Sequence, residues 1–556
     1  MSQSSDDAPT GPIGGRAQQT PEPGTVRIRS LGAEPTRRWN LIADLTAVAL
    51  VVVAAFLPWN LYFGVGVPGS NTTLFVVLLV VTALSVASVG VAGKWRSLAG
   101  GWWRLRLALN APYIGLVLAF VAFDVYETIR FAGTVNVPGG VGPGAWLGIA
   151  GCLSAAGAPI TGPGTEHDTI RSARIIGYAS MAGAVLSFCF NLYWRVRYAL
   201  HSTGGTIDFG KQNIAVIVTA VVYGVVALIA VLAASRWLLR STKAARLATV
   251  ALGASTMLAG LIVWVLPVGR DIDAFHGIAQ NTSTAGVGFE GFLAWAAAAA
   301  IFAPRALSGY RNPSATDEDA WRGAARTGLA LIALWGLGSM AMRITDLGVA
   351  VSLNYPYSRY DSVVLAAFDL ITAVLAIWLR TNLVHDGLRP RLVTALCGLV
   401  ATLSVARVVV GVALAPRFAD SPNSPELHPV YGNNLAQQIT SVFDVALCGL
   451  GLSILAAAIV TGRLSALRQR QRRRAARARA AAAGARPPAP RARVQVGRSA
   501  KPSAAPTTRI PAGAQPDSPT TEIPQLAGAP RIFRGDDSAT GEIPVQQPRI
   551  YRPPHG

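Results

Sequence analysis

Five ionisable residues lie inside strongly apolar segments in the C-terminal half of the sequence. Asp369, for example, stands within LAAFDLITAVLAIWLRT, a stretch that otherwise has the character of a lipid-facing helix. A charge costs roughly 2.5–3.5 kcal/mol at the centre of a membrane-spanning helix, so such residues usually face the protein interior and pair or serve function. The residues of this candidate intramembrane charged cluster are Arg343, Asp346, Asp369, Arg407 and Asp444.

Two kinds of chemistry fit this cluster, and the sequence leaves both open. Counted from the ends of their apolar segments, the five residues fall in the same half of the bilayer, so acids and arginines on neighbouring helices are able to pair. Buried Asp–Arg pairs would then lock the last helices together. Alternatively, the charges form an ion- or proton-coupled site, or a site for a polar lipid headgroup. In a third arrangement, the helices are rotated so that the charges only reach the interface.

Sequence motifs of the common enzyme classes are missing. There is no GxSxG nucleophile motif, no Walker A motif and no GxGxxG motif that opens a βαβ unit. The six histidines are scattered and none stands at metal-ligand spacing, so we assign no metal, no cofactor and no catalytic residue. We expect a non-enzymatic protein, with a membrane-embedded envelope transferase as the less favoured alternative. Asp44, in the first apolar segment, is interpreted as an interfacial group.

The composition indicates which elements must carry the cluster. Hydrophobic residues make up 51% of the 556 residues and charged residues only 14%, against about 25% charged in typical soluble domains. Twelve apolar segments are each about as long as a helix that crosses a bilayer. The sequence therefore predicts an all-α, polytopic bundle with about twelve spans. The segments are 39–58, 72–92, 106–126, 144–161, 175–194, 212–235, 246–267, 286–304, 325–346, 361–380, 391–413 and 435–461.

The distribution of basic residues predicts an orientation in the plasma membrane. Lys and Arg are more frequent in the loops after the even-numbered segments, for example at Lys94, Arg236 and Arg305, than in the other loops. Basic residues are retained on the cytoplasmic side of short loops. We therefore expect both termini to be cytoplasmic.

Spacing within the apolar region suggests internal repetition. Tryptophan recurs after the second and sixth segments and at the end of the tenth, in AGKWRS, ASRWLLRST and AIWLRT, with separations of 142 and 141 residues between Trp95, Trp237 and Trp378. We interpret this as three parallel four-helix units. The alternative is that Trp and Arg gather at membrane interfaces in any such protein. The three units would cover residues 39–161, 175–304 and 325–461.

Two polar tails flank the apolar region, and much of the net charge of +21 lies directly after the last apolar segment. Residues 1–38 and 487–556 have the composition of disordered segments. Between core and tail, residues 463–486 contain nine arginines and no acid. This location favours anionic lipid at the inner leaflet over nucleic acid as the partner. The arginines expected to bind lipid are Arg468, Arg470, Arg472, Arg473, Arg474, Arg477 and Arg479.

The distal tail repeats a short motif three times. TTRIP, TTEIP and TGEIP share the pattern T-x-x-I-P, with their first threonines at Thr507, Thr520 and Thr540. The spacing resembles the phosphothreonine-x-x-Ile motifs that FHA domains read. By this resemblance the three residues are Ser/Thr-kinase sites that recruit an FHA-type partner. Chance duplication in a low-complexity tail is the alternative.

Taken together, basic polar tails around an Ala-, Val- and Leu-rich helical core resemble uncharacterised multi-pass plasma-membrane proteins of mycobacteria and related actinobacteria. The excess of arginine over lysine is typical of such high-GC genomes. The resemblance implies a location in the plasma membrane. We expect a transporter-like or scaffold component of cell-envelope assembly whose cytoplasmic tail is regulated by phosphorylation. The sequence specifies neither a substrate nor an oligomeric state.

Overall fold

The computed structural model describes the helices of the chain and several of the turns between them. The described residues are 33–59, 72–94, 102–130, 141–157, 166–201, 210–265, 289–308, 315–354, 359–383, 389–413 and 442–484. All of these residues except 483 and 484 belong to one compact unit, Met1–Ala482. The C-terminal tail and most of the N-terminal tail expected from the sequence lie outside these residues.

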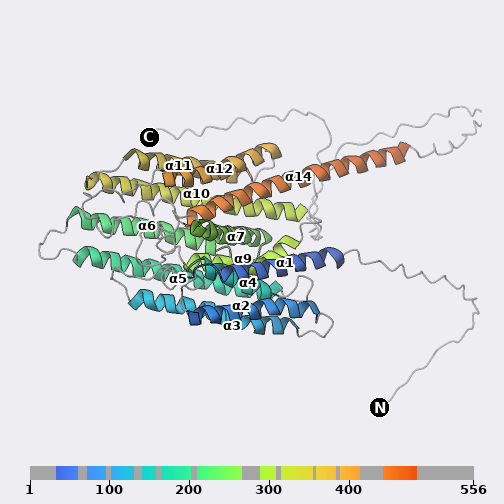
Figure 1. Cartoon of the computed structure of the whole chain (residues 1–556). Coiled ribbons are helices and arrows are strands. Elements are labelled where there is room, and N and C mark those ends of the chain that lie inside the picture. The colour runs from blue at the N-terminus through green and yellow to red at the C-terminus, as the bar shows by residue number, and fades with distance from the viewer. Residues whose placement is uncertain are drawn as a thin grey trace, which may run out of the picture. The chain divides into compact units, whose positions relative to one another are not determined.

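The described part of the chain is all-helical, without a strand, and each of the twelve apolar segments coincides with one helix (Figure 1). The separators are short stretches rich in Gly, Pro and polar residues, which end helices. The helices are α1 (Ala33–Ala54), α2 (Thr72–Lys94), α3 (Trp102–Arg130), α4 (Pro143–Ala156), α5 (Glu166–His201), α6 (Lys211–Ser235), α7 (Lys243–Val265), α9 (Phe289–Ser308), α10 (Ala315–Ser352), α11 (Arg359–Asn382), α12 (Pro390–Ala413) and α14 (Val442–Gly484).

Nine of these helices are long and apolar enough to cross a membrane. They are α2, α3, α5, α6, α7, α10, α11, α12 and α14, whereas α4 and α9 are shorter apolar helices. At 1.5 Å per residue, the 14 residues of α4 measure about 21 Å, less than the ~30 Å hydrocarbon layer. Length and composition thus support crossing for nine of the twelve helices in the described chain.

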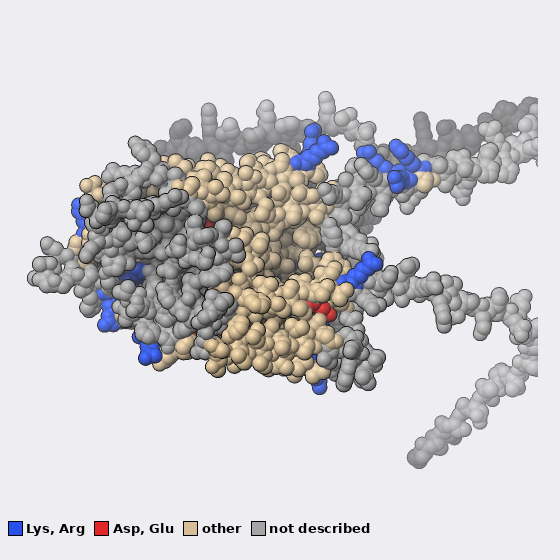
Figure 2. Space-filling model, in the orientation of Figure 1, with Lys and Arg blue, Asp and Glu red and all other residues tan. Residues whose placement is uncertain are grey.

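The outer surface of the helices is aliphatic, as a lipid-facing surface requires. On α11, for example, Ile371 is 56% exposed and Val374 is 55% exposed. In Figure 2 the broad middle of the described surface consists of uncharged residues, and Lys and Arg side chains lie toward its ends. A continuous aliphatic surface of this kind is not stable in water, because monomeric soluble proteins rarely expose large apolar patches.

Aromatic side chains connect the helices at the centre of the compact unit. Trp146 of α4 contacts Phe292 of α9 with ring centroids 4.9 Å apart. Phe443 of α14 lies 5.7 Å from Trp295 of α9 and 4.6 Å from Trp335 of α10. Edge-to-face aromatic packing stabilises such contacts beyond area burial alone. The short helices α4 and α9 are therefore core elements, and α14 joins them through Phe443.

Several helices extend beyond the expected spans. α10 runs from Ala315 to Ser352, and α14 continues through the arginine-rich stretch to Gly484. The extra turns at the start of α10 and at the end of α14 are rich in polar residues, but Ala, Arg, Gln and Glu are good helix formers, so helical structure continues where hydropathy ends. The last six residues of α10, LGVAVS, are apolar. α1 likewise begins at Ala33 and not after residue 38 as expected. Its Pro35 lies in the first turn, where no intrahelical N–H is lost.

The tryptophans that suggested repetition do not share one environment. Trp237 lies in the turn after α6 and is 6% exposed, whereas Trp378 lies within α11 and is 45% exposed. Trp95 lies outside the described residues. The repeat therefore stays a prediction that these markers do not support by themselves.

Candidate functional site

Arg407 of α12 is the centre of a buried cluster built from four helices. Its Nε forms an ion pair with Oδ1 of Asp369 on α11, and its Nη1 pairs with Oδ1 of Asp444 on α14. Its Nη2 donates a hydrogen bond of 2.6 Å to Oγ of Ser339 on α10. Arg407 is 8% exposed, Asp369 1% and Asp444 3%. The structure thus pairs Arg407 with Asp369 and Asp444, which is one of the arrangements that the sequence left open.

The sequence of α10 explains how that helix contributes to the cluster. Trp335, Ser339 and Arg343 are spaced four residues apart and therefore lie on one face of the helix. Trp335 Nε1 donates a hydrogen bond of 2.5 Å to Oδ1 of Asp444, which also accepts from Arg407. Burial of both Trp335 and Asp444 makes this bond part of a water-excluded network.

A glycine allows α10 and α11 to approach at the height of Asp369. A Cβ on Gly336 would lie 2.9 Å from the backbone oxygen of Asp369 and 3.2 Å from Cβ of Ala373. Small residues at helix interfaces permit this kind of close backbone contact. Gly336 therefore sets the distance at which the carboxylate of Asp369 is presented.

Arg343 and Asp346 lie on the same helix but are held differently. Asp346 accepts a hydrogen bond of 2.5 Å from the hydroxyl of Tyr223 on α6. Arg343 is 4% exposed, one turn before Asp346 on the same helix. Because α10 extends to Ser352, both residues lie one to two turns deeper than the sequence suggested. The predicted cluster of five is thus a core around Arg407 with a second branch toward α6.

Asp444 lies closer to the helix end than expected. The sequence placed it about nine residues into a span that begins at residue 435, but α14 begins at Val442 and Asp444 is in its first turn. Residues 435–441 lie outside the described residues. An acidic side chain in a first helical turn is favourable because it faces the positive end of the helix dipole.

Sequence reasoning missed three partners of the cluster: Trp335, Ser339 and Tyr223. The spacing of Trp335, Ser339 and Arg343 was the available signal, since polar groups four residues apart mark one face of a helix. Nothing in the sequence links Tyr223 to Asp346, because they lie on different helices and 123 residues apart.

A second buried polar group lies among the first three helices. Arg106 of α3 donates to Asp44 of α1 at 2.5 Å, with side-chain exposures of 4% and 19%. One turn further, Asn110 bonds to Ser85 at 2.6 Å and to Ser88 at 2.9 Å, both on α2. The interpretation of Asp44 as a merely interfacial group was therefore incomplete, because this residue pairs between helices.

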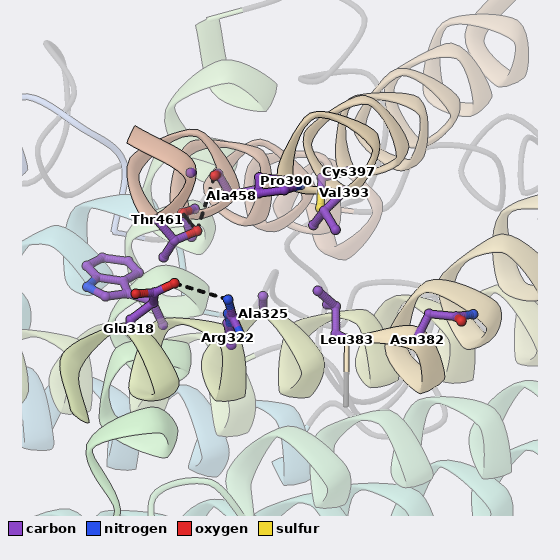
Figure 3. Close-up of a pocket in the computed structure, with 13 residues that line it drawn as sticks. Glu318, Arg322, Ala325, Asn382, Leu383, Pro390, Val393, Cys397, Ala458 and Thr461 are labelled. Atoms are coloured by element: carbon purple, nitrogen blue, oxygen red, sulfur yellow. Dashed lines mark hydrogen bonds and ion pairs between the residues drawn. The ribbon is translucent and has the colours of Figure 1, made fainter. Parts of the chain in front are cut away.

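A pocket lies away from both polar groups, at the end of α10, α11, α12 and α14. Glu318 and Arg322 of α10 form an ion pair at 3.0 Å, which is drawn as a dashed line in Figure 3. Thr461 of α14 and Cys397 of α12 also line the pocket. None of the five residues of the predicted cluster lines this pocket. The pocket and the cluster are therefore separate sites.

Several predicted sites cannot be compared with the structure. Thr507, Thr520 and Thr540 lie outside the described residues. Of the seven arginines assigned to lipid, Arg473, Arg474 and Arg477 are exposed on α14, and the side chains of the others lie outside the described set. Among described residues, no group of three or more His, Cys, Asp or Glu side chains is arranged to hold a metal ion.

Comparison with known proteins identifies the helical region as a family domain. The family model described as "Domain of unknown function (DUF7937)" matches residues 40–463. Neither a curated protein nor a solved structure matches the chain. The matched region covers well over half of the 556 residues and ends one residue after the apolar part of α14, at Gly462. The arginine-rich stretch and the threonine motifs therefore lie beyond the family domain, and the chain belongs to the DUF7937 family.

Proposed function

We propose that the chain is a non-enzymatic plasma-membrane protein that serves as a scaffold component of cell-envelope assembly. One observation carries this proposal: the guanidinium of Arg407 binds carboxylates from two other helices and a hydroxyl from a third, all buried. A guanidinium satisfied in this way holds helices in a fixed arrangement. The cluster then acts as a structural lock, which a scaffold needs and which requires no solvent-accessible cavity.

The proposed topology has twelve spans with both termini in the cytoplasm. Nine helices that meet the length and hydropathy requirement support it, and the basic loops on one side give its orientation. A total of twelve spans requires that α1, α4 and α9 cross the membrane as well. Fluorescent and alkaline-phosphatase reporters fused to each end test this proposal. Fluorescence at both ends supports it, and phosphatase activity at either end contradicts it.

The proposed three-unit organisation receives support from helix contacts. In the first unit, α1 contacts α2 and α4, and α3 contacts α4. In the second, α5 contacts α6 and α9, and α7 contacts α9. Together with the contacts of α2 with α4 and of α6 with α9, four pairs of positions thus meet in both of these units, as repetition about an axis along the membrane normal requires. The extensive contact of α2 with α3 has no comparable counterpart between α6 and α7, so the support covers part of the pattern.

The proposed regulation acts through the two segments beyond the family domain. The arginine-rich part of α14 binds anionic lipid at the inner leaflet, where each basic residue near the surface contributes about 1 kcal/mol. Phosphorylation of Thr507, Thr520 or Thr540 by a Ser/Thr kinase recruits an FHA-type reader, whose arginines grip the phosphate. Phosphopeptide mapping tests this regulation, and absence of phosphate on all three threonines contradicts it.

A transport function is the second candidate, and one observation favours it. The cluster and its branch contain three carboxyl groups but two guanidiniums, so one acid is in excess inside the helical region. Such an excess is what a proton- or cation-coupled site, or a site for a cationic headgroup, provides. Here Asp346, bonded to Tyr223, would be the exchanging group and Arg407 the fixed charge.

Flux measurements separate the two functions. The full chain is reconstituted in vesicles that contain a pH-sensitive dye, and a proton, sodium or potassium gradient is imposed. The scaffold proposal expects no flux above that of empty vesicles, for the wild type and for Asp346→Asn alike. A flux that disappears in Asp346→Asn but persists in Asp319→Asn, an exposed acid on the same helix, contradicts the scaffold and supports transport.

A further inference from the structure

The pocket of Figure 3 lies where four candidate spans end. The apolar part of α10 starts at Glu318, that of α11 ends at Asn382, that of α12 starts at Pro390 and that of α14 ends at Gly462. All four residues line the pocket. The pocket is therefore at the boundary between hydrocarbon and headgroup region, if these helices cross a membrane.

The lining of the pocket combines an apolar base with two opposite charges. Trp321, Val393 and Cys397 belong to the apolar part. The charges come from Glu318 and Arg322, which are one helical turn apart and joined at 3.0 Å, with side-chain exposures of 14% and 38%. A carboxylate and a guanidinium at this spacing match a ligand that itself carries an anion and a cation a few ångströms apart.

The size of the pocket limits what enters it. Its volume is about 70 Å³, room for about five to seven water molecules at ~10–15 Å³ each. A small polar headgroup can enter a space of this size. The chains of a bound lipid would lie outside, along the exposed aliphatic surface that includes Ile377 of α11 and Leu392 of α12.

We propose that this pocket binds the phosphoethanolamine headgroup of a zwitterionic phospholipid, with the phosphate at Arg322 and the primary ammonium at Glu318 and Trp321. Guanidinium binds phosphate through a planar fork of N–H donors, and a carboxylate accepts the N–H groups of an ammonium ion. The face of an indole attracts the same cation. The inference rests on the proposed membrane crossing of α10, α11, α12 and α14.

The site is distinct in chemistry from the arginine-rich part of α14, which begins at its rim. That stretch carries only positive charge, so it attracts anionic lipid without discrimination between headgroups. Glu318 provides the discrimination in the pocket, because it repels a phosphatidylglycerol headgroup and favours one that ends in an ammonium group. A phosphatidylcholine headgroup has a cation but no N–H donor, so it forms no hydrogen bond with the carboxylate.

The test uses the full chain purified in detergent and stripped of lipid. Short-chain phosphatidylethanolamine, phosphatidylglycerol and phosphatidylcholine, and free phosphoethanolamine, are each titrated, and bound species are counted by native mass spectrometry. We expect one phosphatidylethanolamine to bind at least about tenfold more tightly than either other lipid, a difference of about 1.4 kcal/mol. Equal affinity for the three lipids overturns the inference. If free phosphoethanolamine binds as tightly as the lipid, the ligand of the pocket is the free compound and not a phospholipid.

Matched variants localise the effect. Glu318→Gln should remove the preference for phosphatidylethanolamine, whereas Asp319→Asn, on the exposed neighbour, should retain it. Arg322→Gln should weaken binding of phosphatidylethanolamine about tenfold, and Arg380→Gln, on the exposed end of α11, should not. If Glu318→Gln and Asp319→Asn behave alike, the pocket does not select the headgroup.

Two further measurements keep the result interpretable. An unfolding temperature of Glu318→Gln equal to that of the wild type shows that the variant is folded, so lost selectivity then reports on the carboxylate. Replacement of Arg473, Arg474 and Arg477 by Gln should lower phosphatidylglycerol association and leave the single phosphatidylethanolamine site intact. Extraction of membranes with alkaline carbonate separates the two proposals. Release of the protein contradicts membrane crossing, whereas a retained protein without lipid selectivity contradicts only the pocket.

Discussion

Arg106 and Arg407 are buried arginines that form interhelical ion pairs, and they are held in different ways. Arg106 pairs with a single carboxylate, Asp44, which is 19% exposed, and the pair joins two helices. Arg407 pairs with two carboxylates, Asp369 and Asp444, which are almost fully buried, and the set joins four helices with Ser339. The same side chain thus serves a local pair in one region and a convergent network in the other.

The difference in water access decides what each arginine contributes. Asp44 keeps contact with its surroundings, so a lost partner is replaced in part by water or lipid headgroups. Asp369 and Asp444 have no such replacement, and a buried charge without its partner is strongly destabilising. We therefore expect the Arg407 cluster to control the folding of the last four helices, and the Arg106 pair to adjust the stability of the first three.

The largest effect is expected for Arg407→Gln. The substitution leaves two buried carboxylates next to each other and should lower the free energy of unfolding by about 3–5 kcal/mol. Thermal unfolding of the purified protein in detergent, followed by the fraction that stays monodisperse, measures the change. Arg380→Gln is the control, because Arg380 is exposed on α11. A variant of Arg407 that unfolds at the same temperature as the control would refute the lock.

A double-mutant cycle sharpens this result. Asp369→Asn and Arg407→Gln are combined, since the pair should show non-additive effects if the two side chains interact directly. The double variant should be more stable than the sum of the single changes implies. Additivity would show that Arg407 acts through Asp444 and Ser339 alone.

Arg106→Gln should have a smaller effect. It leaves one carboxylate, partly exposed, so we expect a loss of about 1–3 kcal/mol in the free energy of unfolding. The same cycle with Asp44→Asn gives the coupling of this pair. If the Asp44–Arg106 coupling equals or exceeds the Asp369–Arg407 coupling, partner number and burial do not distinguish the two regions.

Most of the secondary structure was predictable from the sequence, because apolar segments of membrane length are interrupted by Gly, Pro and charged residues. The ends were not. Hydropathy places the end of the ninth span at residue 346, but α10 continues to Ser352, and α14 continues to Gly484. In α14 the helix propensity of polar residues extends the helix without any signal in hydropathy. In α10 the added residues, LGVAVS, are apolar, so the expected span ended too early.

The cluster was predictable to the extent that charges are rare in apolar segments. Few acidic residues lie in the apolar segments, so Arg407 had few candidate partners. Two of these acids form ion pairs with it. The neutral partners were not predictable in the same way. Trp335 and Tyr223 are frequent residue types in membrane helices, and only the packing of α10 against α14 and α6 turns them into donors for Asp444 and Asp346.

Gly336→Ala tests whether close helix approach is needed to present Asp369. The added methyl group would lie 2.9 Å from the backbone oxygen of Asp369, so α10 and α11 must separate. Overpacking of this kind costs about 1–3 kcal/mol. Gly348→Ala is the matched control on the same helix, because nothing lies within 4 Å of its added Cβ. It should be neutral or stabilising, since Ala is favoured over Gly in a helix. Equal unfolding temperatures for the two variants would show that α10 and α11 are not held closely at this height.

The smallest expected difference compares one hydroxyl from each region. Ser339 accepts from the guanidinium of Arg407, whereas Ser88 bonds to the neutral amide of Asn110 and to a backbone oxygen. Hydrogen bonds to charged groups contribute about 1.5–3 kcal/mol and neutral ones about 0.5–1.5 kcal/mol. Ser339→Ala should therefore lower the unfolding temperature more than Ser88→Ala. In the Arg407→Gln background, the loss of stability caused by Ser339→Ala should fall to that of a neutral hydrogen bond, because the charged donor to the Ser339 hydroxyl has been removed. An unchanged cost in that background would mean that Ser339 stabilises α10 independently of Arg407, and that the network is smaller than its geometry indicates.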